Sequence, residues 1–460
     1  MGKLINTMDA GFLFIEKQKS PTHVAALAHF RLPDDAPENF LSDLVARWRA
    51  NAHFAPPFNY RLKMLPVPQW EELSDDQIDL DYHFRHSALP APGGERELGV
   101  LVSRLHSHGL DRSRPLWECH LIEGLDNNRF ALYFKVHHSQ IDGVGGIRLF
   151  EKCFPTNPQA KNQQPPWTVG MRGGGRRKKA PPLGEQVGTF VNNRVRNIPA
   201  LTKASARMAG NFLLKGKDAS TPFATAKTVL NGRIHGPRRF ATQQYTMKRL
   251  KAVANELGGT LNDVFLAITA GSLRRYMLEL DALPDRSLNA LVPVSIRPKG
   301  EAEVGNAISF IVAHLHTDID DPLERIRAIH DSVQQAKREL EPIPASAMPN
   351  YTLMLMAPFI GLIALGTSGI GRPMSNITIS NVPGPRKPVY LNGAPLEALY
   401  PVSLVFDGQA LNITVVSYHD TFNIGFTGCR DSLPSMQKMA VYTGEALAEL
   451  EDALGIEQAA

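Results

Sequence analysis

Residues 136–143 read Val-His-His-Ser-Gln-Ile-Asp-Gly, and they lie where an alternating apolar run ends and a glycine-rich turn begins. In the run 130–137 every second residue is apolar, which predicts a strand with one face directed inward. Continued by one residue, this alternation turns His138 inward and His137 outward. Glycines after the stretch allow a tight backbone path, and apolar residues at helical spacing follow as far as Phe154. The sequence therefore predicts an imidazole at a strand end, next to open backbone that a substrate could approach.

Two adjacent histidines and an acid also have simpler interpretations. Neighbouring side chains on a strand diverge, so His137 and His138 would not readily chelate one metal ion, and we expect no metal site. A purely structural histidine is the more serious alternative. The complete pattern His-His-x-x-x-Asp-Gly, with a strand before it and glycine directly after the acid, argues against that alternative.

This pattern resembles the signature of the chloramphenicol-acetyltransferase-like, coenzyme-A-dependent acyltransferases, which include the condensation domains of peptide synthetases. The catalytic site that the resemblance implies consists of His137, His138, Asp142 and Gly143. In such enzymes the second histidine is the general base, which here is His138. The aspartate is largely architectural, and by resemblance the partner of Asp142 in an internal ion pair would be Arg297.

Composition is typical of a soluble globular protein, because 43% of the 460 residues are hydrophobic and 21% are charged. This length predicts two to three domains, or one bilobal enzyme with a shared cleft. Cys119, Cys153 and Cys429 are too widely spaced to indicate a disulfide framework or a zinc cluster, so a reducing cytoplasm fits best. Acidic residues interrupt the first 17 positions before a signal peptide could form, and we expect no export by that route.

Positive charge is concentrated in residues 161–217, where twelve basic residues stand against one acidic residue. The net charge of that segment is +11. Because the net charge of the whole chain is +5, the remaining residues together carry −6. A basic belt on a slightly acidic protein indicates an anionic surface or ligand. We do not expect nucleic acid as the partner, because no aromatic platform or docking fold accompanies the basic run.

The residues 353–365 form the longest apolar run, with thirteen consecutive apolar positions. The run is shorter than the roughly 20 residues that span a bilayer, and Pro358 and Gly361 interrupt it. The simplest interpretation is a buried core helix. The alternatives are a wall of an acyl tunnel or a face laid into a membrane.

Hydrophobic periodicity predicts further elements along both halves of the chain. Strands are expected over 24–32, 117–123, 240–246, 288–296, 308–315, 411–418 and 422–428. Helices are expected over 39–50, 99–107, 248–257, 322–339 and 434–454, together with a longer helix that a capping box of Thr260 and Asp263 begins. Residues 79–92 are expected to form a connector, and 380–385 a turn-rich loop. The domain boundaries follow as an N-terminal lobe over 1–155, a basic Pro/Gly-rich linker over 156–231 with an amphipathic helix over 187–214, and a C-terminal lobe over 232–460.

Several short motifs, taken in order, resemble the bacterial wax ester synthase/acyl-CoA:diacylglycerol acyltransferases. They are Pro115 to Glu118, His137 to Gly143, Leu230 to Gly232 with Arg238-Arg239, Asn262 to Val264, Val292 to Arg297, Gly305-Asn306 and Ser380 to Pro385. The resemblance runs from near residue 8 to near residue 440. It implies an α/β fold of two chloramphenicol-acetyltransferase-like lobes, each a mixed β-sheet flanked by helices, with the active-site tunnel at their interface.

The implied reaction is direct transfer of a long-chain acyl group from acyl-CoA to a fatty alcohol or to diacylglycerol, without a cofactor and without an acyl-enzyme. A hydroxyl is a poor nucleophile until its proton is removed, and an imidazole with a pKa near ~6.5 can accept that proton at neutral pH. Free N–H groups at a helix start could stabilise the oxyanion, which makes Asn262 and Asp263 candidate substrate or oxyanion residues. The expected location is the cytoplasm, with peripheral contact to an anionic membrane surface or a lipid droplet.

Two other functions are compatible with the same residues. One is a condensation-type enzyme that takes acyl groups from a carrier, which an assay with free acyl-CoA would distinguish. The other is a non-catalytic lipid-binding protein that retains the fold. The intact His138, Asp142 and Gly143 argue against the second function.

Overall fold

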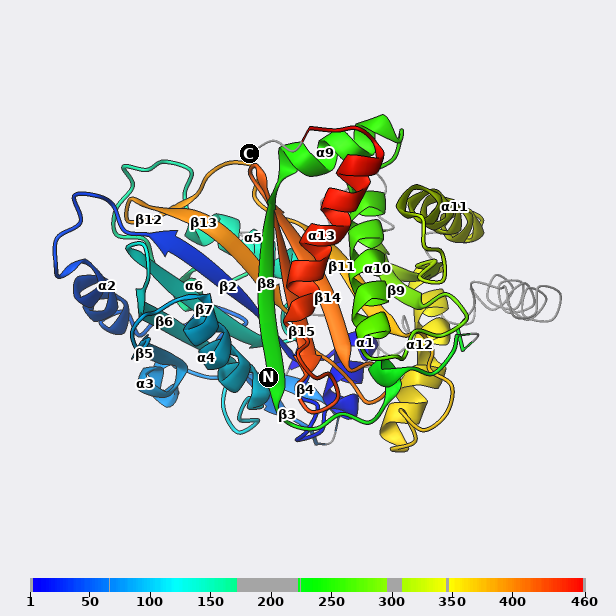
Figure 1. Ribbon diagram of the computed structural model, residues 1–460. Coiled ribbons are helices and arrows are strands. Elements are labelled where there is room, and N and C mark those ends of the chain that lie inside the picture. Colours follow the sequence, from blue (N-terminus) through cyan, green and yellow to red (C-terminus); the bar gives the residue numbers. More distant parts are fainter. Residues whose placement is uncertain are drawn as a thin grey trace.

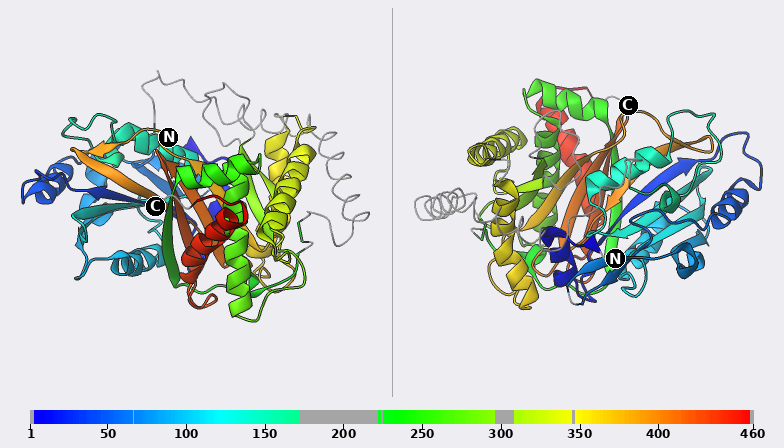
Figure 2. Two further views of the ribbon diagram at one scale, coloured as in Figure 1. Left: turned by 45° about the horizontal axis from the view of Figure 1, so that its top comes forward. Right: turned by 180° about the vertical axis from the view of Figure 1, so that it is seen from behind.

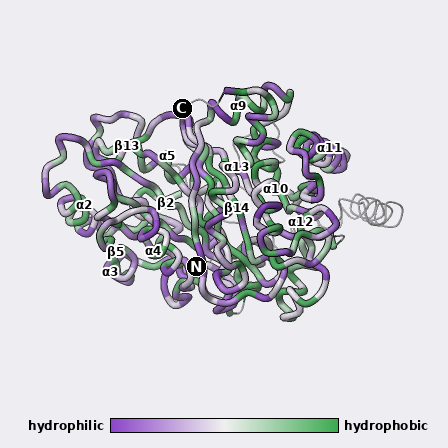
Figure 3. The backbone as a smooth tube through the Cα atoms, viewed as in Figure 1, coloured by the Kyte–Doolittle hydropathy of each residue, from purple (hydrophilic) through white to green (hydrophobic). Residues whose placement is uncertain are grey.

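The computed structural model describes residues 3–65, 67–171, 222–223, 225–295, 308–344 and 347–457. Two six-stranded sheets lie side by side, and each carries helices (Figures 1 and 2). Hydrophilic segments lie mostly at the periphery of the molecule, and hydrophobic ones fill the interior (Figure 3). Both sheets combine parallel and antiparallel pairs, so the expected fold class of two mixed-sheet lobes is confirmed.

The first sheet has the strand order β12-β13-β2-β7-β6-β5. Its strands are β2 (His23–Arg31), β5 (Phe84–Ala88), β6 (Trp117–Leu125), β7 (Arg129–His137), β12 (Tyr390–Leu391) and β13 (Ala394–Val402). Helix α4 (Glu95–Ser107) packs its apolar side against one face, where Tyr133 of β7 is buried. Helices α2 (Phe40–Arg49) and α5 (Gly143–Cys153) pack with the other face, where Leu132 is buried. Because helices cover both faces of β7, neither of the two alternating sets of its side chains forms a solvent-exposed face.

Strands β12 and β13 come from the second half of the chain, so the division expected at residue 231 does not coincide with the division between the sheets. Strand β13 pairs antiparallel with β2, whose edge would otherwise be open. The two sheets meet where Gly425 of the second sheet lies against Pro401 of β13. A Cβ at Gly425 would stand only 1.9 Å from the Pro401 carbonyl oxygen, so only glycine allows this approach.

The second sheet has the strand order β10-β9-β11-β14-β15-β8. Its strands are β8 (Arg238–Thr246), β9 (Asn289–Ser295), β10 (Ile308–His314), β11 (Ile377–Pro383), β14 (Leu411–Tyr418) and β15 (Thr421–Cys429). The helices packed with it are α9 (Met247–Glu256), α10 (Leu261–Glu279), α11 (Pro322–Leu340), α12 (Met348–Ala364) and α13 (Lys438–Ala453). In β14 the side chains of Ile413 and Val415 join the helix-covered core, whereas Asn412 and Thr414 point to the opposite side.

The loop expected over 380–385 is wrong for its first four residues, which belong to β11. Strand β11 pairs in parallel with β14, and this pairing satisfies the backbone of a segment whose Ser, Asn and Pro residues look turn-like in isolation. Only Gly384 and Pro385 lie beyond the strand. By contrast, the capping box at Thr260 and Asp263 is present at the start of α10 as expected.

The segment expected as a linker begins as packed chain. The short helix α6 (Pro166–Val169) buries Trp167 completely, with its ring 5.6 Å from that of Trp48 and 5.5 Å from that of Trp117. Residues 156–171 therefore belong to the packing of the first lobe. The basic run 176–179 and the amphipathic helix expected over 187–214 lie outside the described residues.

Several short elements were not expected from the sequence. A small three-stranded sheet is formed by β1 (Lys3–Leu4), β3 (Tyr60–Lys63) and β4 (Gln69–Glu72). Other unexpected elements include α1 (Thr7–Ile15), α3 (Leu80–His83) and the 3₁₀ turns η1 (Asp75–Gln77) and η3 (Val229–Asn231). Strands β12 and β13 were not expected either, and the connector expected over 79–92 is wrong for 84–88, which form β5. Helix α1 packs against α12, where Gly11 approaches Ile360 (Figure 1). Gly11, Phe12 and Ile15 of α1 also line a cavity between the two lobes.

Candidate active site

A cavity of about 410 Å³ lies between the two lobes. Its walls come from β2, β7, β13 and α5 of the first lobe, from β9, β10, β11, β14 and α12 of the second, and from α1. Most of the lining is apolar, and it includes Leu132, Phe150 and Phe359. Four residues of the His-His-x-x-x-Asp-Gly stretch line it as well, namely His138, Ile141, Asp142 and Gly143. The sequence pattern therefore lies on the wall of an apolar cavity between the two lobes.

His138 follows the last residue of β7 and is half-buried in this cavity. Its backbone N–H donates to the Thr22 carbonyl at 3.0 Å, and its ring stacks on Phe12 with centroids 4.2 Å apart and planes at 18°. Burial lowers the pKa of His138 below its ordinary 6.5, although the charge of Asp142 acts in the opposite direction. At neutral pH the imidazole is therefore uncharged and able to accept a proton.

The orientation of the His138 ring depends on packing. Its Nδ1 atom is buried and has no hydrogen-bond partner among the described residues. No carboxylate therefore orients the ring through this nitrogen in that part of the chain, in contrast to a Ser-His-Asp triad. The Phe12 ring, which α1 carries, stacks on the imidazole and thereby restricts the plane of the His138 ring.

His137 is buried, and the outward position expected for it is wrong. Its Nε2 lies 2.9 Å from Thr22 Oγ1 and 3.5 Å from Glu16 Oε2. Its Nδ1 accepts from the Ser139 backbone N–H at 3.2 Å. Alternation separates the two faces of a strand correctly but does not reveal that the second face is covered too. His137 thus connects the end of β7 to the segment that follows α1.

Glu16 and Arg112 complete this connection, and neither was expected from the sequence. The Arg112 guanidinium donates to Glu16 Oε2 at 2.6 and 2.9 Å. Burial alone would raise the pKa of Glu16, but the hydrogen bonds and charges of His137 and Arg112 outweigh it and lower the pKa to about 2. Because 96 residues separate Arg112 from Glu16, local sequence patterns could not reveal the pair.

Asp142 is the N-cap of α5, where its Oδ1 accepts the Gly145 N–H at 2.6 Å. This bond satisfies one of the free donors at the helix start, so the carboxylate has an architectural task. Its expected ion-pair partner, Arg297, lies outside the described residues. Asp9 of α1 is a second acid close to Asp142. Burial is the main cause that raises the pKa of Asp9 to about 6, and the charge of Asp142 raises it further.

Gly143 allows α5 to begin against the second lobe. A Cβ at this position would lie 3.2 Å from Val382 Cγ2 of β11. That distance is tighter than an ordinary van der Waals contact, so a larger residue would push α5 away from β11. The glycine after the acid thus contributes to closing the cavity between the lobes.

Asn262 and Asp263 do not line the cavity. The Asp263 carboxylate accepts from Thr260 N and Thr260 Oγ1, both at 2.8 Å, and lies 3.0 Å from His330 Nδ1. The helix start that was expected is present, but tertiary packing places it elsewhere. We therefore do not retain these two residues as oxyanion donors.

Besides His138 and Asp142, polar side chains of the second lobe line the cavity. They are Thr378, Ser380 and Asn381 of β11, Asn412 and Thr414 of β14, Thr352 of α12, and Ser403 and Gln409 in the segment between β13 and β14. The sequence of β14 contained a signal for two of these cavity residues, because polar Asn412 and Thr414 alternate with Ile413 and Val415, which are fully buried. Such alternation marks a face that is interior but not purely apolar.

Two further features bear on possible ligands. Within the described ranges, no group of three or more His, Cys, Asp or Glu side chains is arranged to hold a metal ion. Among the helices of that part of the chain, none is long and apolar enough to cross a membrane.

Similarity to known proteins points to one family. The family model described as wax ester synthase/diacylglycerol acyltransferase catalytic domain matches residues 5–265, and the corresponding C-terminal domain matches residues 304–451. The O-acyltransferase WSD of Acinetobacter baylyi is 40% identical over 447 residues, which cover 96% of each chain. The solved wax ester synthase/diacylglycerol acyltransferase of Marinobacter aquaeolei is 38% identical, with a TM-score of 0.78 over 98% of this chain and 100% of that one.

A more distant likeness concerns the fold alone. The first condensation domain of the calcium-dependent antibiotic synthetase superposes with a TM-score of 0.62 at 16% identity, and the match covers 100% of this chain and 98% of that domain. Two such mixed-sheet lobes therefore occur in proteins with little sequence in common.

Proposed function

Because the chain belongs to the wax ester synthase/diacylglycerol acyltransferase family, and is an O-acyltransferase, we propose that it uses His138 as the general base in a direct transfer from acyl-CoA to a fatty alcohol or to diacylglycerol. The observation that carries the proposal is the position of His138. Its imidazole, with a lowered pKa, lines an apolar cavity between the two lobes.

The proposed step begins with the acceptor hydroxyl beside His138. As the hydroxyl oxygen forms a bond to the thioester carbonyl carbon, the imidazole takes the hydroxyl proton, and the carbonyl oxygen gains negative charge. The intermediate then collapses, the carbon–sulfur bond breaks, and the departing thiolate receives the proton from the imidazolium. The ester and free CoA leave, and the histidine returns to its neutral form. General-base assistance of this kind contributes on the order of 10²- to 10⁴-fold.

The apolar lining supports long-chain substrates. Each methylene that moves from water into such a cavity contributes about 0.8 kcal/mol, so long chains are favoured over short ones. Direct transfer is supported by the sequence, since it contains no Gly-x-Ser-x-Gly elbow that would present a serine nucleophile.

The decisive experiment measures release of the CoA thiol from a long-chain acyl-CoA by the purified protein. Hexadecanol and diacylglycerol are supplied separately as acceptors, and the ester product is identified. We expect thiol release that depends on the acceptor. Activity only with a carrier-bound acyl donor would instead indicate a condensation-type enzyme, and binding of lipid without any thiol release would indicate a non-catalytic protein.

Substrates of this kind barely dissolve, so we further propose that the protein works at a lipid surface. The basic segment 161–217, with its net charge of +11, would provide the main attraction to an anionic membrane or lipid droplet.

A further inference from the structure

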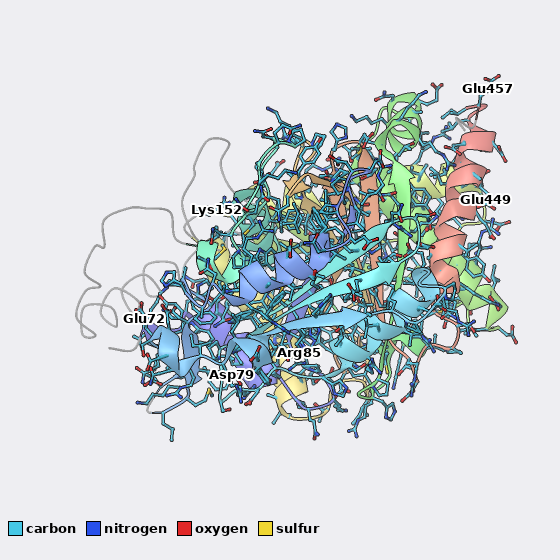
Figure 4. All side chains as sticks on the ribbon, turned by 90° about the vertical axis from the view of Figure 1, so that its left-hand side faces the viewer. Glu72, Asp79, Arg85, Lys152, Glu449 and Glu457 are labelled. Carbon is cyan, nitrogen blue, oxygen red and sulfur yellow. The ribbon has the colours of Figure 1, made fainter. Side chains whose placement is uncertain are left out.

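Helix α12 has an outer face without any charge. None of its 17 residues is acidic or basic, and Ala357, Pro358, Ala364 and the following Leu365 are exposed. Leu365 is 79% exposed, and a Cβ built at Gly361, on the same side of the helix, meets nothing within 4 Å among the described residues. Surface helices normally carry polar residues on the outer side, as α13 does with Glu449 (Figure 4). The outer face of α12 therefore departs from that rule.

The inner face of the same helix forms a wall of the catalytic cavity. Leu353, Met356, Phe359 and Ile360 all line it. Helix α12 thus separates the space beside His138 from the outside of the molecule. A surface that contacts this helix from outside is one helix diameter, about 10 Å, from the cavity.

Cations surround the end of α12, and backbone carbonyls hold them in place. Lys17 Nζ donates to the Ile363 carbonyl at 2.6 Å, and Arg233 Nη2 donates to the Gly366 carbonyl at 3.0 Å. Lys227 Nζ donates to the Ile370 carbonyl at 2.9 Å. The hydrogen bond from Lys17 caps the C-terminal end of α12. Arg233 and Lys227 instead bond to carbonyls beyond the last residue of the helix. Their positive charges are therefore placed around the turn 365–372 itself.

No acid offsets these charges along the same segment. The sequence contains neither Asp nor Glu from residue 342 to residue 396. Within the turn, Ile370 is 56% exposed and Arg372 is exposed as well. Exposed apolar side chains beside cations match the two layers of a phospholipid leaflet, in which anionic headgroups cover an apolar interior.

We propose that the outer face of α12 and the turn 365–372 dock on an anionic phospholipid leaflet. Leu365 and Ile370 enter the boundary between headgroups and acyl chains, while Lys227, Arg233 and Arg372 contact the headgroup phosphates. The choice of a lipid leaflet over an acidic protein rests on the proposed function, since the cavity behind the same helix would then receive lipid substrates.

A fluorescent probe at Leu365 tests the docking directly. The three natural cysteines are buried, so an environment-sensitive dye reacts selectively with a new surface cysteine in Leu365→Cys. The matched control is Leu278→Cys, because Leu278 is also an exposed leucine, 53% exposed, but lies on α10. With vesicles that contain phosphatidylglycerol, we expect a blue shift and a gain in intensity at position 365 and no change at 278. Equal responses at both positions, or none at 365, would overturn the proposal.

A pair of double variants separates docking from catalysis. Leu365→Ser with Ile370→Ser should bind phosphatidylglycerol vesicles about tenfold more weakly, since two apolar side chains no longer enter the leaflet. The control is Leu278→Ser with Val441→Ser, which removes two other exposed apolar side chains, from α10 and α13, and should bind like the wild type. Both variants should keep wild-type thiol release with a water-soluble acceptor in detergent. Unchanged vesicle binding of the first variant would contradict the docking surface, whereas absence of thiol release from every form of the protein would contradict the proposed function instead.

A charge variant identifies the lipid. Lys227→Gln with Arg233→Gln should weaken binding to phosphatidylglycerol vesicles and leave the weak binding to phosphatidylcholine vesicles unchanged. Lys248→Gln with Lys251→Gln removes the same charge from exposed positions of α9 and should have a much smaller effect. Equal losses from the two variants would mean that only the net charge of the protein matters, which is contrary to a defined docking surface.

Discussion

At the scale of single residues, the two adjacent histidines have different tasks. His138 lines the cavity and stacks on Phe12, whereas His137 is fully buried among Glu16, Thr22 and Ser139. The division follows from the strand, because neighbouring residues of β7 point to opposite faces. One face holds the proposed substrate, and the other holds the connection to the segment after α1.

The first prediction concerns these two histidines. His138→Ala should lower turnover by about 10²-fold or more, the usual loss when a general base is removed. His137→Ala should lower turnover less and should lower the melting temperature, because it leaves buried polar partners unsatisfied. Thiol release and thermal unfolding are measured on both. A folded His138→Ala enzyme with wild-type turnover would exclude the mechanism.

The second prediction separates two structural tasks of Asp142. Asparagine caps a helix about as well as aspartate, so Asp142→Asn should preserve the cap of α5, whereas Asp142→Ala should lose about 1 kcal/mol from it. A buried cationic partner would be left unpaired by either change. Melting temperatures therefore decide between the tasks: equal losses indicate the ion pair, and a larger loss for alanine indicates the cap. Lost activity with unchanged stability in both variants would point to a direct chemical role.

The third prediction uses the carboxylate of Glu16, whose pKa falls from the ordinary 4.5 to about 2. A depressed pKa stabilises the folded state above about pH 4.5, and this contribution disappears as the pH falls towards 2. A shift of this size corresponds to the order of 3 kcal/mol. Denaturant unfolding of Glu16→Gln should therefore show a deficit at pH 6 that shrinks on acidification. Glu71→Gln, which breaks an exposed pair with Arg61, should show a much smaller deficit, and equal deficits would refute the buried network.

At the scale of elements, α1 and the start of α5 shape the site. Helix α1 begins at the N-cap Asn6, whose side chain accepts the Asp9 N–H at 2.8 Å, and this spacing was a usable sequence signal. The helix then brings Phe12 to His138. The start of α5 brings Asp142 and Gly143 to β11, so the two lobes meet at the cavity.

The fourth prediction tests the contact between α5 and β11. Gly143→Ala should reduce turnover and lower the melting temperature, because its Cβ would press on Val382. Val382→Ala provides space for that Cβ and should restore much of both losses in the double variant. A double-mutant cycle measures the coupling. Strictly additive effects would show that Gly143 is required for a reason other than this contact.

At the scale of the whole molecule, charge and cavity are distributed differently. The cavity belongs to the interface of the lobes, whereas the positive charge is concentrated in residues 161–217. Most of that segment lies outside the described residues. Its contribution to lipid binding is therefore predicted from charge alone, separately from the docking surface on α12.

The fifth prediction is that the basic segment makes binding to anionic vesicles sensitive to salt. Basic residues near such a surface contribute on the order of 1 kcal/mol each, and this attraction decays within a Debye length of about 8 Å at physiological salt. Co-sedimentation should be firm at low salt and partial at near-molar salt. Changing Arg176, Arg177, Lys178 and Lys179 to Gln should weaken it. Binding that ignores both the salt and these changes would place the main attraction elsewhere.

The sequence alone determined the local elements and the family. Period-two alternation located β7, β14 and β15, and the Thr260–Asp263 capping box located the start of α10, because such signals depend on residues close together in the chain. The ordered motifs indicated two mixed-sheet lobes and an acyltransferase, which the fold and the similarity to known proteins confirm.

Tertiary structure alone decided which of these elements meet. It placed β13 beside β2, joined Arg112 to Glu16, and left Asn262 and Asp263 away from the cavity. A local pattern gives the conformation of a segment and which side chains share a face, but not which distant surface will cover that face. That outcome depends on which sheet edges remain free and which apolar faces fit together, and both are properties of the assembled chain.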